Sequence, residues 1–307
     1  MSRRPPRAAG FTLVELIVVI VVTAIVASFM VLFLDAPVQS YFAQTRRSDL
    51  VDSANRITRA VTADARTALP NSMRVNAART ALELLSTTGV ARYYGQGDKS
   101  PPAPPPPQAG EELTIGTPAS TFGTLESFTA QARSYQAPYL SIGNLGATPY
   151  NAYNSANGVM TPATTVVTVG PNPSLAPPPP FVAAENQVTL SAQMTFKAAG
   201  APATQPSVHN AYLVSGPVSY VCNSNPRNPS AGTVMRYSGY AVRAAQPVPP
   251  AGGSSALIAH DVSACTISIV AAPAGYAYGQ LAILDVTLTS NGETLQVFFE
   301  MPTEYSR

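Results

Sequence analysis

The stretch that constrains this chain most is an apolar run close to its N-terminus. Between Leu16 and Leu34 the sequence contains no charged residue, no glycine and no proline, and apolar side chains fall on every side of a helix. A helix that begins at Phe11 and covers this run is about 36 Å long at about 1.5 Å per residue, which is enough to cross a bilayer. The pattern therefore predicts a transmembrane helix over residues 11–34.

The charges on either side of the run predict its orientation. Arg3, Arg4 and Arg7 precede it with no acidic residue among them, whereas Asp35 is the only charge between the run and Arg46. Positively charged flanks stay in the cytoplasm. We therefore expect a cytoplasmic N-terminus and export of the rest of the chain.

Two ordinary kinds of segment compete for this run. A cleaved secretory signal needs a small-x-small site after a shorter apolar region, and Ala24–Ser28 matches that requirement poorly. A plain uncleaved anchor gives no reason for Glu15, because a carboxylate in or near hydrocarbon costs about 2–3 kcal/mol unless it is paired or lies at the interface. Glu15 is thus a candidate functional residue, and an interfacial position in a plain anchor is the alternative.

Residues 10–15, Gly-Phe-Thr-Leu-Val-Glu, precede an unbroken apolar helix. This arrangement resembles the prepilin cleavage and methylation motif of type IV pilins and type II secretion pseudopilins. The resemblance implies that residues 1–10 are a leader, and that a prepilin peptidase cuts between Gly10 and Phe11 and methylates the new amine of Phe11. It also implies that Glu15 pairs with that amine of a neighbouring subunit. The expected partners are the peptidase, other major and minor pilin subunits, the inner-membrane assembly platform and the membrane.

A second helical pattern follows the apolar run, over residues 35–72. Pro37 predicts a kink or short break, because proline lacks the amide hydrogen and crowds the preceding turn. The helix is expected to end near Leu69, before Pro70. Its apolar residues recur at steps of three or four and predict a stripe that packs on a sheet: Leu50, Ala54, Ile57, Val61, Ala65 and Ala68.

The remaining residues, 73–307, predict one β-rich head domain with proline-rich insertions near 101–107 and 177–180. The expected fold class is α+β: a long N-terminal helix, half transmembrane and half amphipathic, on an antiparallel sheet, as in type IV pilins. Asn291-Gly292 predicts a tight hairpin turn. Candidate strands cover residues 80–85, 90–94, 113–115, 125–128, 187–191, 194–196, 211–214, 218–222, 233–242, 257–262, 265–270, 281–289 and 294–299.

Residues 35–41, the Arg46-Arg47 pair with the helix that follows it, and Leu82–Leu85 resemble the MshO type of minor pilin of the MSHA pilus system. They are also similar to PilW-type minor pilins and to the J-type pseudopilin. The resemblance implies a subunit that helps to initiate, cap or assemble a type IV pilus. It would first span the inner membrane once, with its head in the periplasm, and then enter an extracellular filament. The alternatives are a type II secretion pseudopilin, a tip adhesin and an anchored periplasmic enzyme.

The cysteines, histidines and charges bear on the other classes of function. Cys222 and Cys265 lie in the exported part, where an oxidising compartment favours a disulfide between them over two free thiols. His209 and His260 have no metal-ligand spacing, so no metal or other cofactor is predicted. His260 and Asp261 are neighbours on a predicted strand and are expected to point to opposite faces.

The sequence has no Gly-x-Ser-x-Gly elbow, no phosphate loop of the Gly-x-x-x-x-Gly-Lys type and no metal-binding histidine pair, and we predict that the protein is not an enzyme. Without the leader, 15 basic residues face 16 acidic ones. No nucleic-acid partner is expected, because such binding requires a basic patch.

Overall fold

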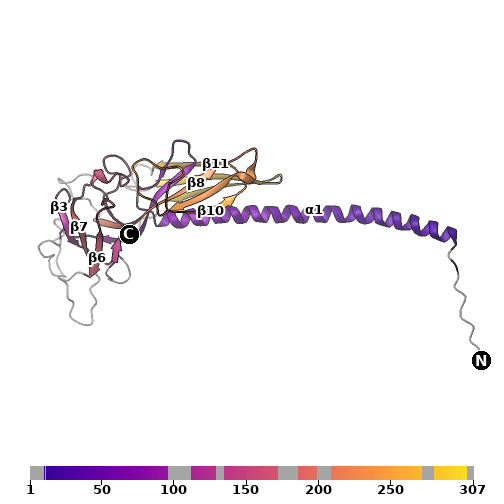
Figure 1. The fold of residues 1–307 in the computed structure, drawn as a ribbon, viewed down its shortest axis with the longest axis horizontal. Coiled ribbons are helices and arrows are strands. Elements are labelled where there is room, and N and C mark those ends of the chain that lie inside the picture. The colour runs from indigo at the N-terminus through magenta and orange to yellow at the C-terminus, as the bar shows by residue number, and fades with distance from the viewer. Residues whose placement is uncertain are drawn as a thin grey trace, which may run out of the picture.

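The computed structural model describes residues 10, 12–95, 112–128, 135–171, 186–198, 209–271 and 280–302, with backbone alone for 31, 32, 34–36, 135, 271 and 302. Both proline-rich blocks, near 101–107 and 177–180, lie outside these residues. The described chain forms one long N-terminal helix and a mostly antiparallel β domain (Figure 1). This arrangement is consistent with the expected α+β class.

Helix α1 (Leu13–Arg66) is 54 residues long and continues through Pro37, so the predicted break is wrong. Figure 1 shows a gently curved helix rather than two segments. Proline removes one main-chain hydrogen bond and crowds one turn, which costs about 3 kcal/mol inside a helix. The helix continues for several turns on both sides of Pro37, and this local cost does not break it.

The helix ends at Arg66, three residues before the predicted end at Leu69. The chain leaves the helix here because its backbone bonds to strand β2 (Ala81–Arg92) instead. The amide of Leu69 donates to the carbonyl of Leu85 at 2.7 Å, and the amide of Thr87 donates to the carbonyl of Thr67 at 2.7 Å.

Three antiparallel sheets make up the head. The first sheet has the order β1-β2-β8-β9-β10 with β5 also paired to β8, the second has the order β11-β12-β13, and the third has the order β3-β7-β6-β4. The other strands are β1 (Arg74–Val75), β3 (Pro118–Gly123), β4 (Tyr135–Ala137), β5 (Tyr139–Ile142), β6 (Val167–Pro171), β7 (Asn186–Thr195), β8 (Asn210–Asn223), β9 (Thr233–Ser238), β10 (Ser254–His260), β11 (Val262–Ala271), β12 (Gln280–Ser290) and β13 (Glu293–Pro302); two short 3-10 helices are η1 (Ser155–Asn157) and η2 (Pro229–Ala231).

Several predicted pairs of short strands are single long strands. The break expected between the predicted strands 80–85 and 90–94 is an irregularity inside β2, where the register shifts on either side of Thr87. A side chain at Gly89 would meet the Phe128 carbonyl at 2.6 Å, so the glycine permits close backbone approach rather than a turn. Likewise, β7 and β8 each join two predicted strands, whereas residues 113–115 and 125–128 form no strand.

The C-terminal half of α1 packs against the first two sheets. All six residues of the predicted apolar stripe are buried and belong to one core cluster with side chains of β2, β8 and β12. The amphipathic prediction is therefore confirmed. This cluster fixes the helix to the head.

A second lobe of the head lies beyond the C-terminal end of α1 (Figure 1). It contains the sheet β3-β7-β6-β4 and has a separate apolar cluster in which Phe122, Phe196 and Leu140 are fully buried. A smaller third cluster includes Leu69, just after α1, and Val214 of β8. The helix packs on the first lobe, and the second lobe extends the molecule along the helix direction.

The predicted hairpin turn at Asn291-Gly292 is confirmed. Ser290 pairs with Glu293 across the β12–β13 turn, where Asn291 and Gly292 have φ angles of 46° and 88°. Both angles are left-handed, as this type of tight hairpin turn requires.

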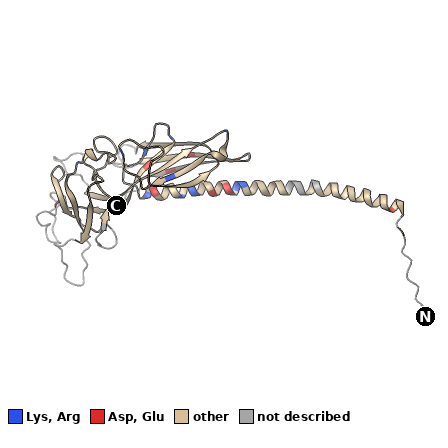
Figure 2. Cartoon of the chain, viewed as in Figure 1, with Lys and Arg blue, Asp and Glu red and all other residues tan. Residues whose placement is uncertain are grey.

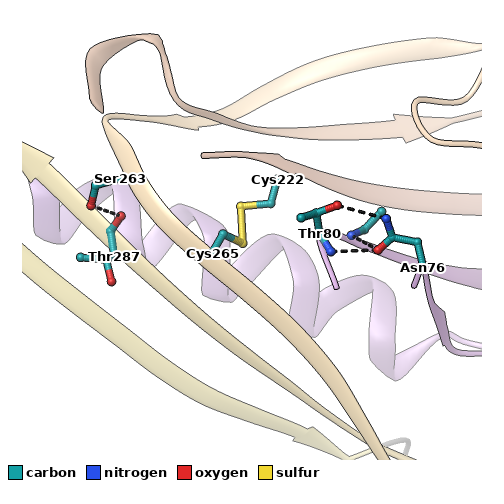
Figure 3. Close-up of a disulfide and its surroundings, with 7 residues drawn as sticks. Asn76, Thr80, Cys222, Ser263, Cys265 and Thr287 are labelled. Carbon is teal, nitrogen blue, oxygen red and sulfur yellow. Dashed lines mark hydrogen bonds between the residues drawn. A yellow bond between two sulfur atoms is a disulfide. The ribbon is translucent and has the colours of Figure 1, made fainter. Parts of the chain in front are cut away.

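The predicted disulfide is also present. Cys222 of β8 is bonded to Cys265 of β11, so the disulfide joins the first and second sheets (Figure 3). Beside it, Asn76 accepts from the amides of Thr80 and Ala81, and the amide of Cys222 donates to the Thr80 carbonyl at 2.8 Å. The disulfide therefore lies next to a hydrogen-bonded turn.

Candidate functional site: the N-terminal helix

The start of α1 carries a capping contact that the sequence analysis missed. Thr12 has extended backbone angles, and its hydroxyl accepts a hydrogen bond from the amide of Glu15 at 3.3 Å. Thr12 and Glu15 have the spacing of a Ser/Thr-x-x-Glu helix start, which is the signal that could have identified the cap. Gly10, just before it, is exposed.

The proposed cleavage and methylation chemistry falls mainly outside the described residues. Phe11 and residues 1–9, including Arg3, Arg4 and Arg7, are not described. Cleavage after Gly10 and methylation of Phe11 therefore stay predictions.

The N-terminal half of α1 is bare within the molecule. The segment Leu13–Met30 has a mean hydropathy of 2.8, and none of it is buried against the rest of the chain. It is long and apolar enough to cross a membrane. Figure 2 shows that the charged residues of α1 gather beside the head and leave most of this half uncharged.

Polar side chains in the bare half are satisfied by their own helix. The Thr23 hydroxyl lies 2.7 Å from the Val19 carbonyl and donates to it, and the Ser28 hydroxyl donates to the Ala24 carbonyl at 2.8 Å. Hydrocarbon offers no hydrogen-bond partners, so such internal bonds make these residues compatible with lipid.

Glu15 is the exception in this half. It lies in the first turn, where the helix dipole favours a negative charge, and it is exposed. Within the described part of the chain, its carboxylate has no ion-pair partner. An external cation could therefore bind it.

The other half of α1 is clamped to the head by charge. Arg236 of β9 donates to both carboxylate oxygens of Asp64, from Nε at 2.7 Å and from Nη2 at 3.0 Å, and the Tyr220 hydroxyl donates to the same carboxylate at 2.5 Å. Burial, together with this carboxylate, raises the pKa of Tyr220, and the hydrogen bond to Asp64 raises the pKa of Arg236. The three side chains thus join α1 to β8 and β9 through hydrogen bonds and an ion pair.

A second polar cluster lies within the head. Arg74 of β1 donates to Glu83 of β2 at 2.6 Å, and its guanidinium lies 3.6 Å from the centre of the Tyr153 ring. The Tyr240 hydroxyl donates to Glu83 at 2.9 Å. Burial raises the pKa of Glu83 despite these partners. Because its groups bond to one another, we assign this cluster a structural role.

One prediction about side-chain direction is wrong. His260 and Asp261 do not point to opposite faces, because the Nδ1 of His260 lies 2.6 Å from the Oδ2 of Asp261. Asp261 has a φ angle of 64° and interrupts the chain between β10 and β11, so the alternation of a regular strand does not apply. In the described residues no group of three or more histidine, cysteine or acidic side chains could hold a metal ion.

Comparison with known proteins identifies one feature of the chain. Residues 5–31 match the family model described as the prokaryotic N-terminal methylation motif. No curated protein and no solved structure matches the chain. The matched residues include Gly10, Phe11 and Glu15 and the whole bare segment Leu13–Met30. The motif and the fold support a type IV pilin-like protein with a membrane-anchoring N-terminal helix.

Proposed function

We propose that this protein is a minor pilin of the MshO kind, which is cut by a prepilin peptidase and helps to initiate, cap or assemble an MSHA-type pilus. The observation that carries the proposal is the division of α1. Its methylation-motif half is bare and apolar, whereas its C-terminal part, from Leu50 onward, buries one face against the head. A helix that first lies in lipid and later packs among other helices needs such a bare surface.

Glu15 gives the bare half a means of selecting its partner. A lone carboxylate in an apolar environment is costly, and a neighbouring α-amine would neutralise it. In the proposed filament that amine is the methylated N-terminus of Phe11 from the next subunit. Glu15 has no ion-pair partner among the described residues of its own chain, which agrees with such a role.

The shape of the head favours an initiating or capping role over that of a repeated subunit. The second lobe lies beyond the end of α1 and lengthens the molecule along the helix direction (Figure 1). In a filament of parallel helices, a lobe at this end would occupy space above the subunit. A subunit placed once at the end of the filament avoids that conflict.

Similarity to MshO over residues 35–95 supports the choice of pilus system. The same features are similar to PilW-type pilins and the J-type pseudopilin. These classes are distinguished by identifying the filament into which the protein is incorporated in the cell. We assign no catalytic activity to the protein.

The test combines intact-mass analysis with recovery in sheared filaments. We expect membrane-extracted protein to lack residues 1–10 and to carry one methyl group on Phe11, and to remain uncut in cells without the peptidase. Glu15→Ala should be cut but absent from filaments, while Asp52→Ala, an exposed acid on the same helix, should be incorporated normally.

An uncut Met1 terminus, or cleavage near Ala27, would overturn the pilin assignment. Normal incorporation of Glu15→Ala would overturn the role of the carboxylate. Cut protein found in a type II secretion pseudopilus instead of a pilus would assign the chain to the pseudopilin class.

A further inference from the structure

We propose that Tyr41 and Phe42 anchor the unassembled protein in the lipid headgroup layer on the head-domain side of the bilayer, and so set the depth of α1. The inference rests on the membrane-anchored state of the proposed function. It assigns a partner to residues that lie beyond the apolar run.

The two aromatic side chains are large, adjacent and uncovered by the head. Tyr41 is 66% exposed and Phe42 is 55% exposed, and their rings meet edge to face with centroids 5.9 Å apart. Val38 lies three and four residues earlier, on the same side of the helix, and is also exposed. Among the described side chains of α1, the first buried one is Leu50. This apolar face therefore has no partner in the described part of the molecule.

The spacing of charges along α1 locates this face relative to a bilayer. Glu15 and Asp35 are separated by 20 residues, or about 30 Å of helix, which is the thickness of the hydrocarbon core. Ile25 then lies at the midplane. Tyr41 is 16 residues further, about 24 Å along the helix axis.

Two geometric effects reduce the distance between the two rings and the bilayer midplane. Helix side chains point back toward the N-terminus, which here means toward the membrane. A common tilt of about 20° shortens the distance along the membrane normal further. Together they place the rings about 21 Å from the midplane, inside a headgroup layer that extends from about 15 to 22 Å.

Aromatic rings with one polar edge prefer that layer. Tyr41 can leave its ring among the lipids while its hydroxyl stays hydrated, and Phe42 and Val38 add apolar surface beside it. The face is also continuous with the apolar helix that already contacts lipid. For these reasons we favour a lipid interface over a second protein chain as its partner.

An anchor at Tyr41 and Phe42 also fixes the position of the N-terminal end of α1 in the bilayer. With the outer interface fixed at residues 41–42, the first residue of α1, Leu13, lies about 3 Å beyond Glu15 at the opposite face of the bilayer, and the bond after Gly10 precedes it in the chain. Residues 43–49 then form about 10 Å of helix between the headgroups and the first buried turn. The head is held clear of the membrane while the cleavage site is presented to the peptidase.

The experiment uses the absence of tryptophan from the native chain. Each of three full-length variants, Phe42→Trp, Phe29→Trp and Phe298→Trp, carries one reporter at an exposed phenylalanine. They are reconstituted at low density into phosphatidylcholine and phosphatidylglycerol vesicles. A fraction of the lipids carries a nitroxide either on the headgroup or near the end of an acyl chain.

We expect the fluorescence of Phe42→Trp to be blue-shifted and quenched more by the headgroup label than by the acyl-chain label. Phe29→Trp, about 6 Å from the midplane, should show the reverse order. Phe298→Trp, on β13 in the head, should emit as in water and be quenched by neither label.

Emission from Phe42→Trp that matches Phe298→Trp would overturn the proposal while leaving membrane anchoring intact. Blue-shifted emission that neither label quenches would overturn it in favour of contact with a second copy. If Phe29→Trp also escapes both labels, the membrane-anchored state itself is wrong, and the failure belongs to the proposed function.

Discussion

The charge clamp between α1 and the head gives the most quantitative prediction. Asp64→Ala removes the acceptor of two hydrogen bonds from Arg236 and one from Tyr220. The buried Tyr220 hydroxyl would lose its partner, at a cost of about 1–3 kcal/mol. The Arg236 side chain is 30% exposed and can be rehydrated in part, so we assign its loss only about 1 kcal/mol. The expected destabilisation is about 3 kcal/mol.

The assay is thermal unfolding of the full chain in detergent, followed by near-ultraviolet circular dichroism of the tyrosines. For a domain of this size, about 3 kcal/mol corresponds to a fall in Tm of about 6–12 °C. Asp52→Ala is the matched control, because Asp52 is an exposed acid on the same helix. It should change stability by less than about 0.5 kcal/mol.

A double-mutant cycle separates the pair from general damage to the helix. Asp64→Ala combined with Arg236→Met should be less destabilised than the sum of the single changes, by about 1 kcal/mol or more. Equal stability of Asp64→Ala and Asp52→Ala would refute the reasoning. In that case the apolar stripe alone would hold the helix on the head.

Three further predictions concern the core, the disulfide and pH. Ile57→Ala, at a fully buried position, should destabilise the head by about 2–5 kcal/mol in denaturant unfolding. The control Val51→Ala, at a position that is 41% exposed, should cost less than about 1 kcal/mol. Equal losses of stability would contradict the assigned helix face. The paired change Cys222→Ser with Cys265→Ser opens a link of 43 residues and should cost about 4 kcal/mol in the chain-entropy model, and a reductant should then have no further effect on unfolding. Burial raises the pKa of Glu83 above 4.5, so its stabilising contribution is full below that pH and is lost as the pH rises through the folded-state pKa. The unfolding free energy of the native chain minus that of Glu83→Gln should therefore fall as the pH rises above 4.5, and a rise would contradict the assigned shift.

Local periodicity was enough to predict the elements that depend on near neighbours. The stripe through Leu50, Ile57 and Val61 repeats at helical spacing, and each of these side chains is buried. Asn291-Gly292 carries its own backbone preference, and the hairpin turn forms there. In both cases the decisive interactions lie within a few residues of one another.

The missed features depend on contacts far apart in the sequence. A break between residues 85 and 90 looks reasonable from the local sequence, but β2 pairs with β8 along its whole length, and Gly89 allows the close approach of Phe128. Helix α1 ends early because residues 67–69 bond to β2. The partner of Asp64 is Arg236, 172 residues away, and no single-sequence pattern identifies it.

The two halves of α1 satisfy their polar side chains in different ways, and this difference bears on the proposed transfer of one helix from lipid to a filament. In the docked half, Asp64 and Arg56 bond to groups of the head, at Arg236 and at the Ile258 carbonyl. In the bare half, hydroxyls such as that of Thr23 bond to their own helix. Under the proposed function, transfer from lipid to a filament would require no change in the head or in these hydroxyls. The Glu15 carboxylate would be the group that gains a partner, and the proposal therefore assigns to it the distinction between assembly and residence in the membrane.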